Sequence, residues 1–123
     1  MRTYGLDRIC NIDFCTKKYI LIGFDPEEYF KNSIGIISPT TAPPTIKIAV
    51  KKQQAQYLIT QPLHVNQKVL QVDEEQVIFE LKVHPTYELK SILLSYGIEF
   101  KVLEPKELRE EIKTILNETL GNY

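Results

Sequence analysis

Residues 45–103 predict an α+β fold built on a four-stranded antiparallel sheet. Four short segments alternate apolar and polar residues, which is typical of strands with one buried face. Two other segments repeat apolar residues every three or four positions, as amphipathic helices do. The order strand, helix, strand, strand, helix, strand with right-handed crossovers predicts the ferredoxin-like (βαββαβ) arrangement. We expect the spatial strand order fourth, first, third, second, with both helices on one face.

The first half of this domain contributes three strands and one helix. Residues 45–51 alternate Ile and Val with Lys, and residues 52–60 carry an apolar stripe that Pro62 ends. Residues 68–72 and 77–83 are two further strands. The polar turn between them is short, so we expect an antiparallel hairpin.

The second half contributes a helix, a strand and an added C-terminal helix. A helical stripe covers residues 87–96, and Gly97 suits the position after a helix end. Residues 98–103 form the fourth strand, Pro105 opens the last helix and Gly121 ends it. The last helix has the apolar stripe Leu108, Ile112, Ile115, Leu116 and Leu120. The expected core is Ile46, Ile48, Val50, Phe79, Leu81, Leu89, Leu93, Phe100 and Val102.

The composition changes at residues 38–44, where three prolines and no large apolar residue indicate an extended linker. We therefore divide the chain into residues 1–37, this linker, and the domain at residues 45–123. The first piece is expected to be a short β-rich arm, with a strand at residues 2–9 and an apolar run at residues 19–23. It has no core of its own. We expect it to become ordered by pairing, as a hairpin on its own chain or against a second copy.

Charge and hydropathy exclude several classes of protein. Lys plus Arg is 15 and Asp plus Glu is 16, so the chain has no general attraction to nucleic acid or acidic membranes. No apolar run approaches the ~20 residues that a membrane helix needs. Phe79 is the only aromatic residue on the two central strands, so we expect core packing there and not stacking of RNA bases.

Few residues offer chemistry. Cys10 and Cys15 are the only cysteines, and a zinc site needs more ligands at closer spacing. We interpret them as reduced thiols, with a disulfide or a metal as the alternatives, and His64 and His84 as surface or packing residues. The neighbouring carboxylates at 74–75 and 110–111 lie on solvated positions, and no glycine-rich phosphate loop occurs. We therefore expect no catalytic residue, metal or cofactor.

Several segments, in order, resemble one bacterial family. Residues 2–9 (RTYGLDRI) resemble the closing strand of the WYL domain, and residues 24–36 resemble the segment that follows it. Residues 62–64, 89–97 and 102–105 resemble landmarks of the WYL C-terminal extension, or WCX, domain. The chain is thus similar to the C-terminal part of a WYL-domain transcription regulator. The Trp-Tyr-Leu signature and a helix-turn-helix are absent, so we expect a C-terminal fragment.

The resemblance implies a non-enzymatic regulatory and dimerisation module of a ligand-responsive cytoplasmic regulator. The full-length layout would be helix-turn-helix, WYL domain and WCX domain, with DNA bound only through the helix-turn-helix. A nucleotide or nucleic acid would be the effector, and a homodimer the assembly. Arg2 and Arg8 match family arginines and become candidate ligand contacts, whereas Gly5 stands where the family often has Arg. Arg8 could instead pair with Asp7 or Asp13.

A second reading is a stand-alone ferredoxin-like small-molecule sensor appended to another protein. Sequence upstream of residue 1 would discriminate between the two: a helix-turn-helix supports the first and a catalytic domain the second.

Overall fold

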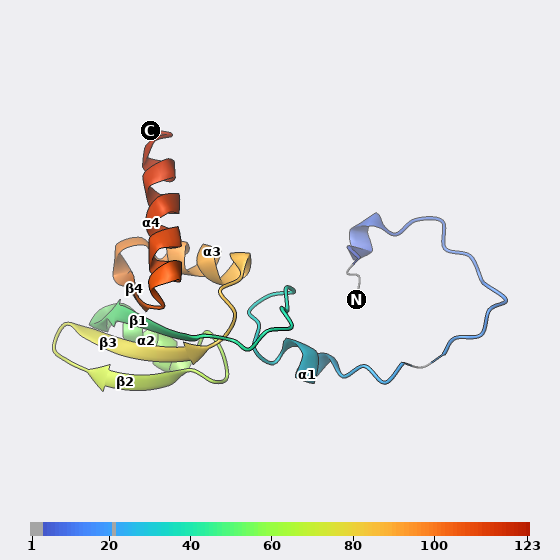
Figure 1. The fold of residues 1–123 in the computed structure, drawn as a ribbon, viewed down its shortest axis with the longest axis horizontal. Helices are drawn as coiled ribbons and strands as arrows, with labels where there is room; N and C mark the ends of the chain where they lie inside the picture. Colours follow the sequence, from blue (N-terminus) through green and yellow to red (C-terminus); the bar gives the residue numbers. More distant parts are fainter. Residues whose placement is uncertain (1–3, 21) are drawn as a thin grey trace.

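The computed structural model describes residues 4–20 and 22–123 (Figure 1). It is an α+β structure in which one antiparallel sheet has the order β2-β3-β1-β4. This order is the one predicted, and it makes the domain ferredoxin-like with an added C-terminal helix. The elements are η1 (Leu6–Arg8), α1 (Pro26–Phe30), β1 (Thr45–Lys51), α2 (Lys52–Thr60), β2 (Lys68–Val72), β3 (Gln76–Lys82), α3 (Tyr87–Ser95), η2 (Gly97–Glu99), β4 (Phe100–Glu104) and α4 (Lys106–Leu120).

The register of the sheet places most of its buried apolar residues on one face. Ile48 of β1 lies opposite Phe79 of β3 and Val102 of β4, so alternate residues on these three strands share a side. Helices α2, α3 and the start of α4 cover this side. The buried core comprises Ile46, Ile48, Val50, Ala55, Leu58, Val77, Phe79, Leu81, Val83, Leu89, Leu93, Val102 and Leu108.

One predicted core residue, Phe100, is only half-buried. It starts the edge strand β4 and stacks on Tyr96, with 4.3 Å between ring centroids. Gly97 has a φ of +55°, turns the chain after α3 and begins η2. The fourth strand therefore begins at Phe100, two residues later than predicted.

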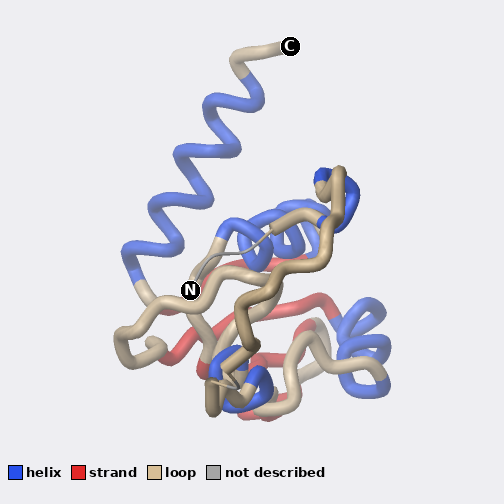
Figure 2. The backbone as a smooth tube through the Cα atoms, turned by 90° about the vertical axis from the view of Figure 1, so that its right-hand side faces the viewer, coloured by secondary structure: helices blue, strands red, loops and turns tan. Residues whose placement is uncertain are grey.

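Helix α4 is long, but only its first half packs on the domain. Leu108 is in the core and Ile112 lies against it, whereas Leu116 and Leu120 are 51% and 73% exposed. Figure 2 shows the helix projecting away from the sheet and the other helices. The predicted apolar stripe is thus present, but Leu116 and Leu120 in its second half stay largely exposed.

The N-terminal arm, residues 4–24 apart from the undescribed residue 21, differs from the prediction. The strand predicted at residues 2–9 is wrong where the structure describes it, because Leu6–Arg8 form a 3-10 turn. Residues 4–20 and 22–24 form no strand pairing, so the own-chain hairpin is also wrong for these residues. A strand needs a neighbour for its backbone N–H and C=O groups, and this chain supplies none there. Pairing with a second copy stays a prediction.

Candidate functional site

A short segment before the sheet domain lies against the connection between β3 and α3. We call residues 32–37 the latch. Every second residue of the latch makes a hydrogen bond to this connection or to the start of α3. The N–H of His84 donates to Asn32 O (3.0 Å), and the Thr86 hydroxyl donates to Ile34 O (3.1 Å). The N–H of Ile36 donates to Glu88 Oε1 (3.4 Å). The latch is therefore fixed to the start of α3, although it precedes the proline-rich segment in the sequence.

Gly35 permits this close approach. Its φ is +90°, a conformation that side chains rarely adopt. A Cβ added at this position would lie 2.5 Å from the Cγ of Glu88. Beside it, Ile34 packs against the core cluster. The latch thus touches both the helix start and the core.

Thr86 has two functions at this contact. It is buried, it donates to the latch, and its Oγ1 also accepts from the backbone N–H of Leu89 at 3.3 Å. The second bond caps the N-terminus of α3, where backbone N–H groups otherwise lack partners. One hydroxyl therefore couples the position of the latch to the first turn of the helix.

Two hollows flank His84, which is 5% exposed. One has a volume of about 290 Å³ and lies between α1, the latch and Thr41. The other has a volume of about 430 Å³ and is lined by Ile37, Pro44 and Tyr87 among others. The structure therefore places His84 as a packing residue, and His64 is half-buried with its Nδ1 accepting from a backbone N–H.

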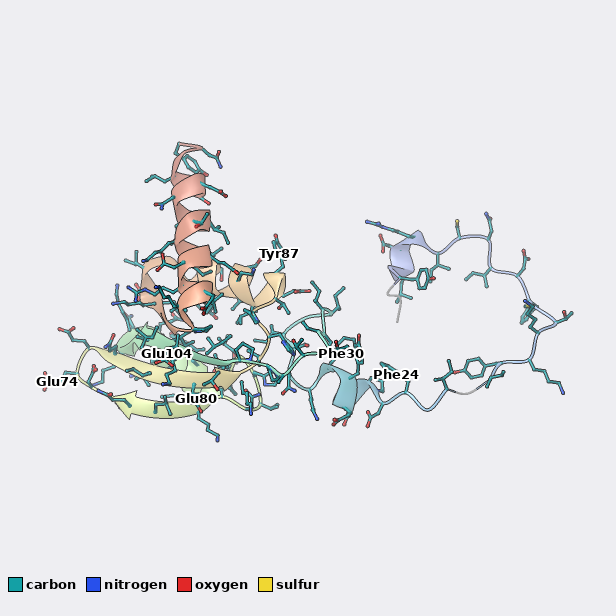
Figure 3. The ribbon with its side chains drawn as sticks, in the orientation of Figure 1. Phe24, Phe30, Glu74, Glu80, Tyr87 and Glu104 are labelled. Atoms are coloured by element: carbon teal, nitrogen blue, oxygen red, sulfur yellow. The ribbon has the colours of Figure 1, made fainter. Side chains whose placement is uncertain are left out.

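The face of the sheet opposite the core is the second surface. We call it the open face; it carries Thr45, Lys47, Ala49, Lys51, Lys68, Gln71, Gln76, Ile78, Glu80, Lys82, Lys101 and Glu104. Glu80 and Glu104 are labelled on the sheet in Figure 3. Lys47 Nζ lies 3.0 Å from Glu104 Oε2. The open face is thus mostly charged, with a small apolar centre.

The third surface is a groove between β4 and α4. Its apolar lining comes from Phe100, Val102, Ile112 and Leu116, and Lys101, Arg109 and Lys113 also line it. Lys113 donates to Glu110 at 2.9 Å, and this hydrogen bond lowers the pKa of the Glu110 carboxyl. The paired carboxylates 110–111 therefore act in surface ion pairs.

The candidate ligand residues are not gathered into a site. Arg2 lies outside the described residues. Arg8 is exposed, and its Nε lies 3.9 Å from Asp7 Oδ2, the pairing considered as the alternative. A ligand role for Arg2 and Arg8 stays a prediction.

The cysteines are free and exposed on the arm. Within residues 4–20 and 22–123, no three His, Cys, Asp or Glu side chains group as metal ligands would. Asp73 is a structural residue that the sequence analysis missed. Its Oδ1 accepts from the N–H groups of Gln76 (2.7 Å) and Glu75 (3.0 Å), and these bonds lower its pKa. An Asp at the first position of a tight turn is the signal that identifies such a residue.

Comparison with known proteins identifies the domain. The family model of the WCX domain matches residues 42–120, more than half of the chain. Among curated proteins, none matches the chain. WCX domains occur in WYL-domain transcription regulators, which supports a regulatory role, and they are not known as enzymes. In the described part of the chain, every helix is too short or too polar to span a membrane. Because the WCX match covers more than half of its residues, the chain belongs to the WCX domain family.

Proposed function

We propose that this chain is the regulatory and dimerisation module of a ligand-responsive transcription regulator of the helix-turn-helix, WYL and WCX type. The WCX match over residues 42–120 carries this proposal. The module is non-enzymatic in the proposal, and it works in the cytoplasm as a homodimer. The effector is a nucleotide or nucleic acid, with Arg2 and Arg8 as its contacts.

The latch is the proposed route from the ligand-sensing part to the WCX domain. It connects directly to the residues that resemble the end of a WYL domain, and it is bonded to the start of α3. A displacement of the arm by an effector would pull on Ile34 and Thr86. Because Ile34 also contacts the core, the strain would reach the sheet domain rather than end in a loose linker.

DNA binding is proposed to belong to the helix-turn-helix and not to this domain. The C-terminal helix α4 mixes Lys106, Arg109 and Lys113 with four glutamates, so it lacks the basic face that phosphates require. We expect the 123-residue chain to show no salt-sensitive, sub-micromolar binding of duplex DNA in a gel shift. Such binding would contradict this assignment.

The latch offers a matched pair of variants for a test of the relay. Gly35→Ala places a methyl group against Glu88, whereas Gly23→Ala places it in open space. In the intact regulator, we expect Gly35→Ala to change effector-dependent transcription of a reporter at least fivefold, and Gly23→Ala to leave it unchanged. Thermal melting of both variants separates loss of signalling from loss of folding. An unchanged response in a folded Gly35→Ala variant would overturn the relay.

A further inference from the structure

We propose that the open face of the sheet binds the open face of a second copy of this chain, about a two-fold axis parallel to the strands. This rests on the proposed dimerisation and names the surface that performs it. The strand register, and not the apolar residues alone, carries the inference.

Four charged residues form a row across all four strands of the open face. Lys68 of β2 lies opposite Glu80 of β3, Glu80 lies opposite Lys47 of β1, and Lys47 lies opposite Glu104 of β4. Along the sheet order, the row therefore reads positive, negative, positive, negative. Neighbouring opposite charges support the sheet within one chain.

The alternating row is also complementary to itself. A two-fold axis parallel to the strands, midway between β3 and β1, reverses the strand order of the second sheet. Lys68 then faces Glu104 of the second copy, and Glu80 faces Lys47 of the second copy. All four intermolecular pairs have opposite charges, as a symmetric interface requires.

A two-fold axis running across the strands would do the opposite. It places each strand on its own copy, so Lys68 would face Lys68 and Glu80 would face Glu80. Like charges in contact are unfavourable. The register therefore favours the axis parallel to the strands over the axis across them.

The next row of the open face fits the same symmetry. In order across the strands it contains Gln71, Ile78, Ala49 and Lys101. The axis places the partly buried Ile78 against Ala49 of the second copy, next to the axis. Ala49 is small, so this row carries no bulky side chain opposite Ile78 of the second copy. At the rim of this row, the Gln71 amide faces Lys101 of the second copy.

The size of the face determines the strength of the interaction. Three strand spacings of about 4.8 Å and strands of roughly 20 Å give a contact below the ~800 Å² per partner of a standard interface. The charged side chains of the interface lie near solvent, so salt weakens the attraction between them. We expect dissociation constants on the order of 10 to 100 µM at low salt, weakened at least tenfold at 0.5 M salt.

Charge reversal tests the row with a matched pair of variants. Lys47→Glu with Lys68→Glu makes the row entirely acidic, and Glu80→Lys with Glu104→Lys makes it entirely basic. In sedimentation equilibrium of the 123-residue chain, we expect each variant alone to self-associate at least tenfold more weakly than the unaltered chain. An equimolar mixture should restore association. Lys17→Glu with Lys18→Glu on the arm is the control and should leave self-association unchanged.

A cross-linking measurement keeps the row unaltered, in case a charge variant fails to fold. With Cys10 and Cys15 replaced by serine, one chain carries Gln71→Cys and the other Lys101→Cys. We expect the mixture to form disulfide-linked dimers at least fivefold faster than either chain alone. Equal rates would overturn the proposed axis.

The outcomes separate this inference from the proposed function. A chain that remains monomeric at millimolar concentration overturns both the face and the proposed dimerisation. A dimer that is indifferent to the charge variants, or that disappears when residues 1–24 are deleted, overturns only the open face and assigns the dimer to another surface.

Discussion

The arm and the sheet domain contain similar apolar residues, but those of the arm are exposed and those of the domain core are buried. The arm carries Leu6, Phe14 and Ile20, all largely exposed, whereas Phe79 and Leu93 of the domain are buried. Apolar content therefore does not decide whether a segment folds. The domain supplies covering helices for the apolar face of β1, β3 and β4, whereas residues 4–20 and 22–24 of the arm have no covering element.

The latch lies between these two extremes. By sequence it belongs to the N-terminal piece, residues 1–37, because the proline-rich residues 38–44 separate it from the domain. By contact it belongs to the domain, because it is hydrogen-bonded to His84 and Thr86. The boundary between the exposed arm and the packed domain therefore lies before the latch, near α1.

The largest expected effect compares two phenylalanines. Phe79→Ala should lower the free energy of unfolding by about 3–5 kcal/mol, because it opens a cavity in the core. Phe14→Ala removes a fully exposed ring and should leave it unchanged within about 0.5 kcal/mol. Urea unfolding measures both. Equal losses would break the distinction between arm and domain.

The second comparison uses the two glycines on either side of α1. Gly35→Ala forces a methyl group against Glu88 at a positive φ, so we expect a loss of roughly 1–3 kcal/mol. Gly23→Ala meets no atom within 4 Å and should be neutral or slightly stabilising. Thermal melting distinguishes them. If Gly35→Ala leaves the thermal stability unchanged, the latch does not contribute to the domain and behaves like the arm.

A smaller effect is expected at the hydroxyl that joins the latch to α3. Thr86→Val keeps the shape and removes both hydrogen bonds, and it should lower the free energy of unfolding by about 1–2 kcal/mol. Thr86→Ser keeps the hydroxyl and should lose less than Thr86→Val. If both substitutions lower the stability equally, the hydroxyl does not provide the coupling.

The smallest expected effect is on the stability at acidic pH. The folded-state pKa of Asp73 lies below its ordinary value of 3.8, chiefly because Gln76 N–H donates to the carboxylate. Its contribution to the β2–β3 hairpin is therefore complete above about pH 3.8 and is lost as the pH falls through the lower folded-state value. NMR titration should give a midpoint below 3.8. Asp73→Asn should remove the corresponding pH dependence of stability.

The sequence predicted the domain well because its signals are local. Alternation in residues 45–51 and the stripe in residues 87–96 report which face is buried, and the strand order follows from connection rules. The exposed end of α4 was missed, because Leu116 and Leu120 continue the same stripe beyond the body that covers it. The pattern shows that a residue is apolar, and only the tertiary structure shows what lies against it.

The candidate functional surfaces were less accessible to sequence reasoning. The latch depends on hydrogen bonds across about fifty residues, and Gly35 gives no sign of its distant neighbour Glu88. The charge row on the open face depends on strand register, which turn lengths and bulges set. The candidate ligand residues Arg2 and Arg8, in contrast, were predicted from the family resemblance alone. In the described part of the chain, no contact brings Arg8 to another positively charged side chain.

Native-state hydrogen exchange of the 123-residue chain tests the central claim, that the latch is part of the domain and the arm is not. The amide of His84, which donates to Asn32, should be as protected as the amides of the first turn of α3. Gly35→Ala should reduce the protection of His84 at least tenfold and leave the protection of Phe79 within threefold. The amides of residues 4–20 should exchange at the rates of an unfolded chain. Protection of the arm in a monomeric sample, or free exchange at His84, would contradict the account.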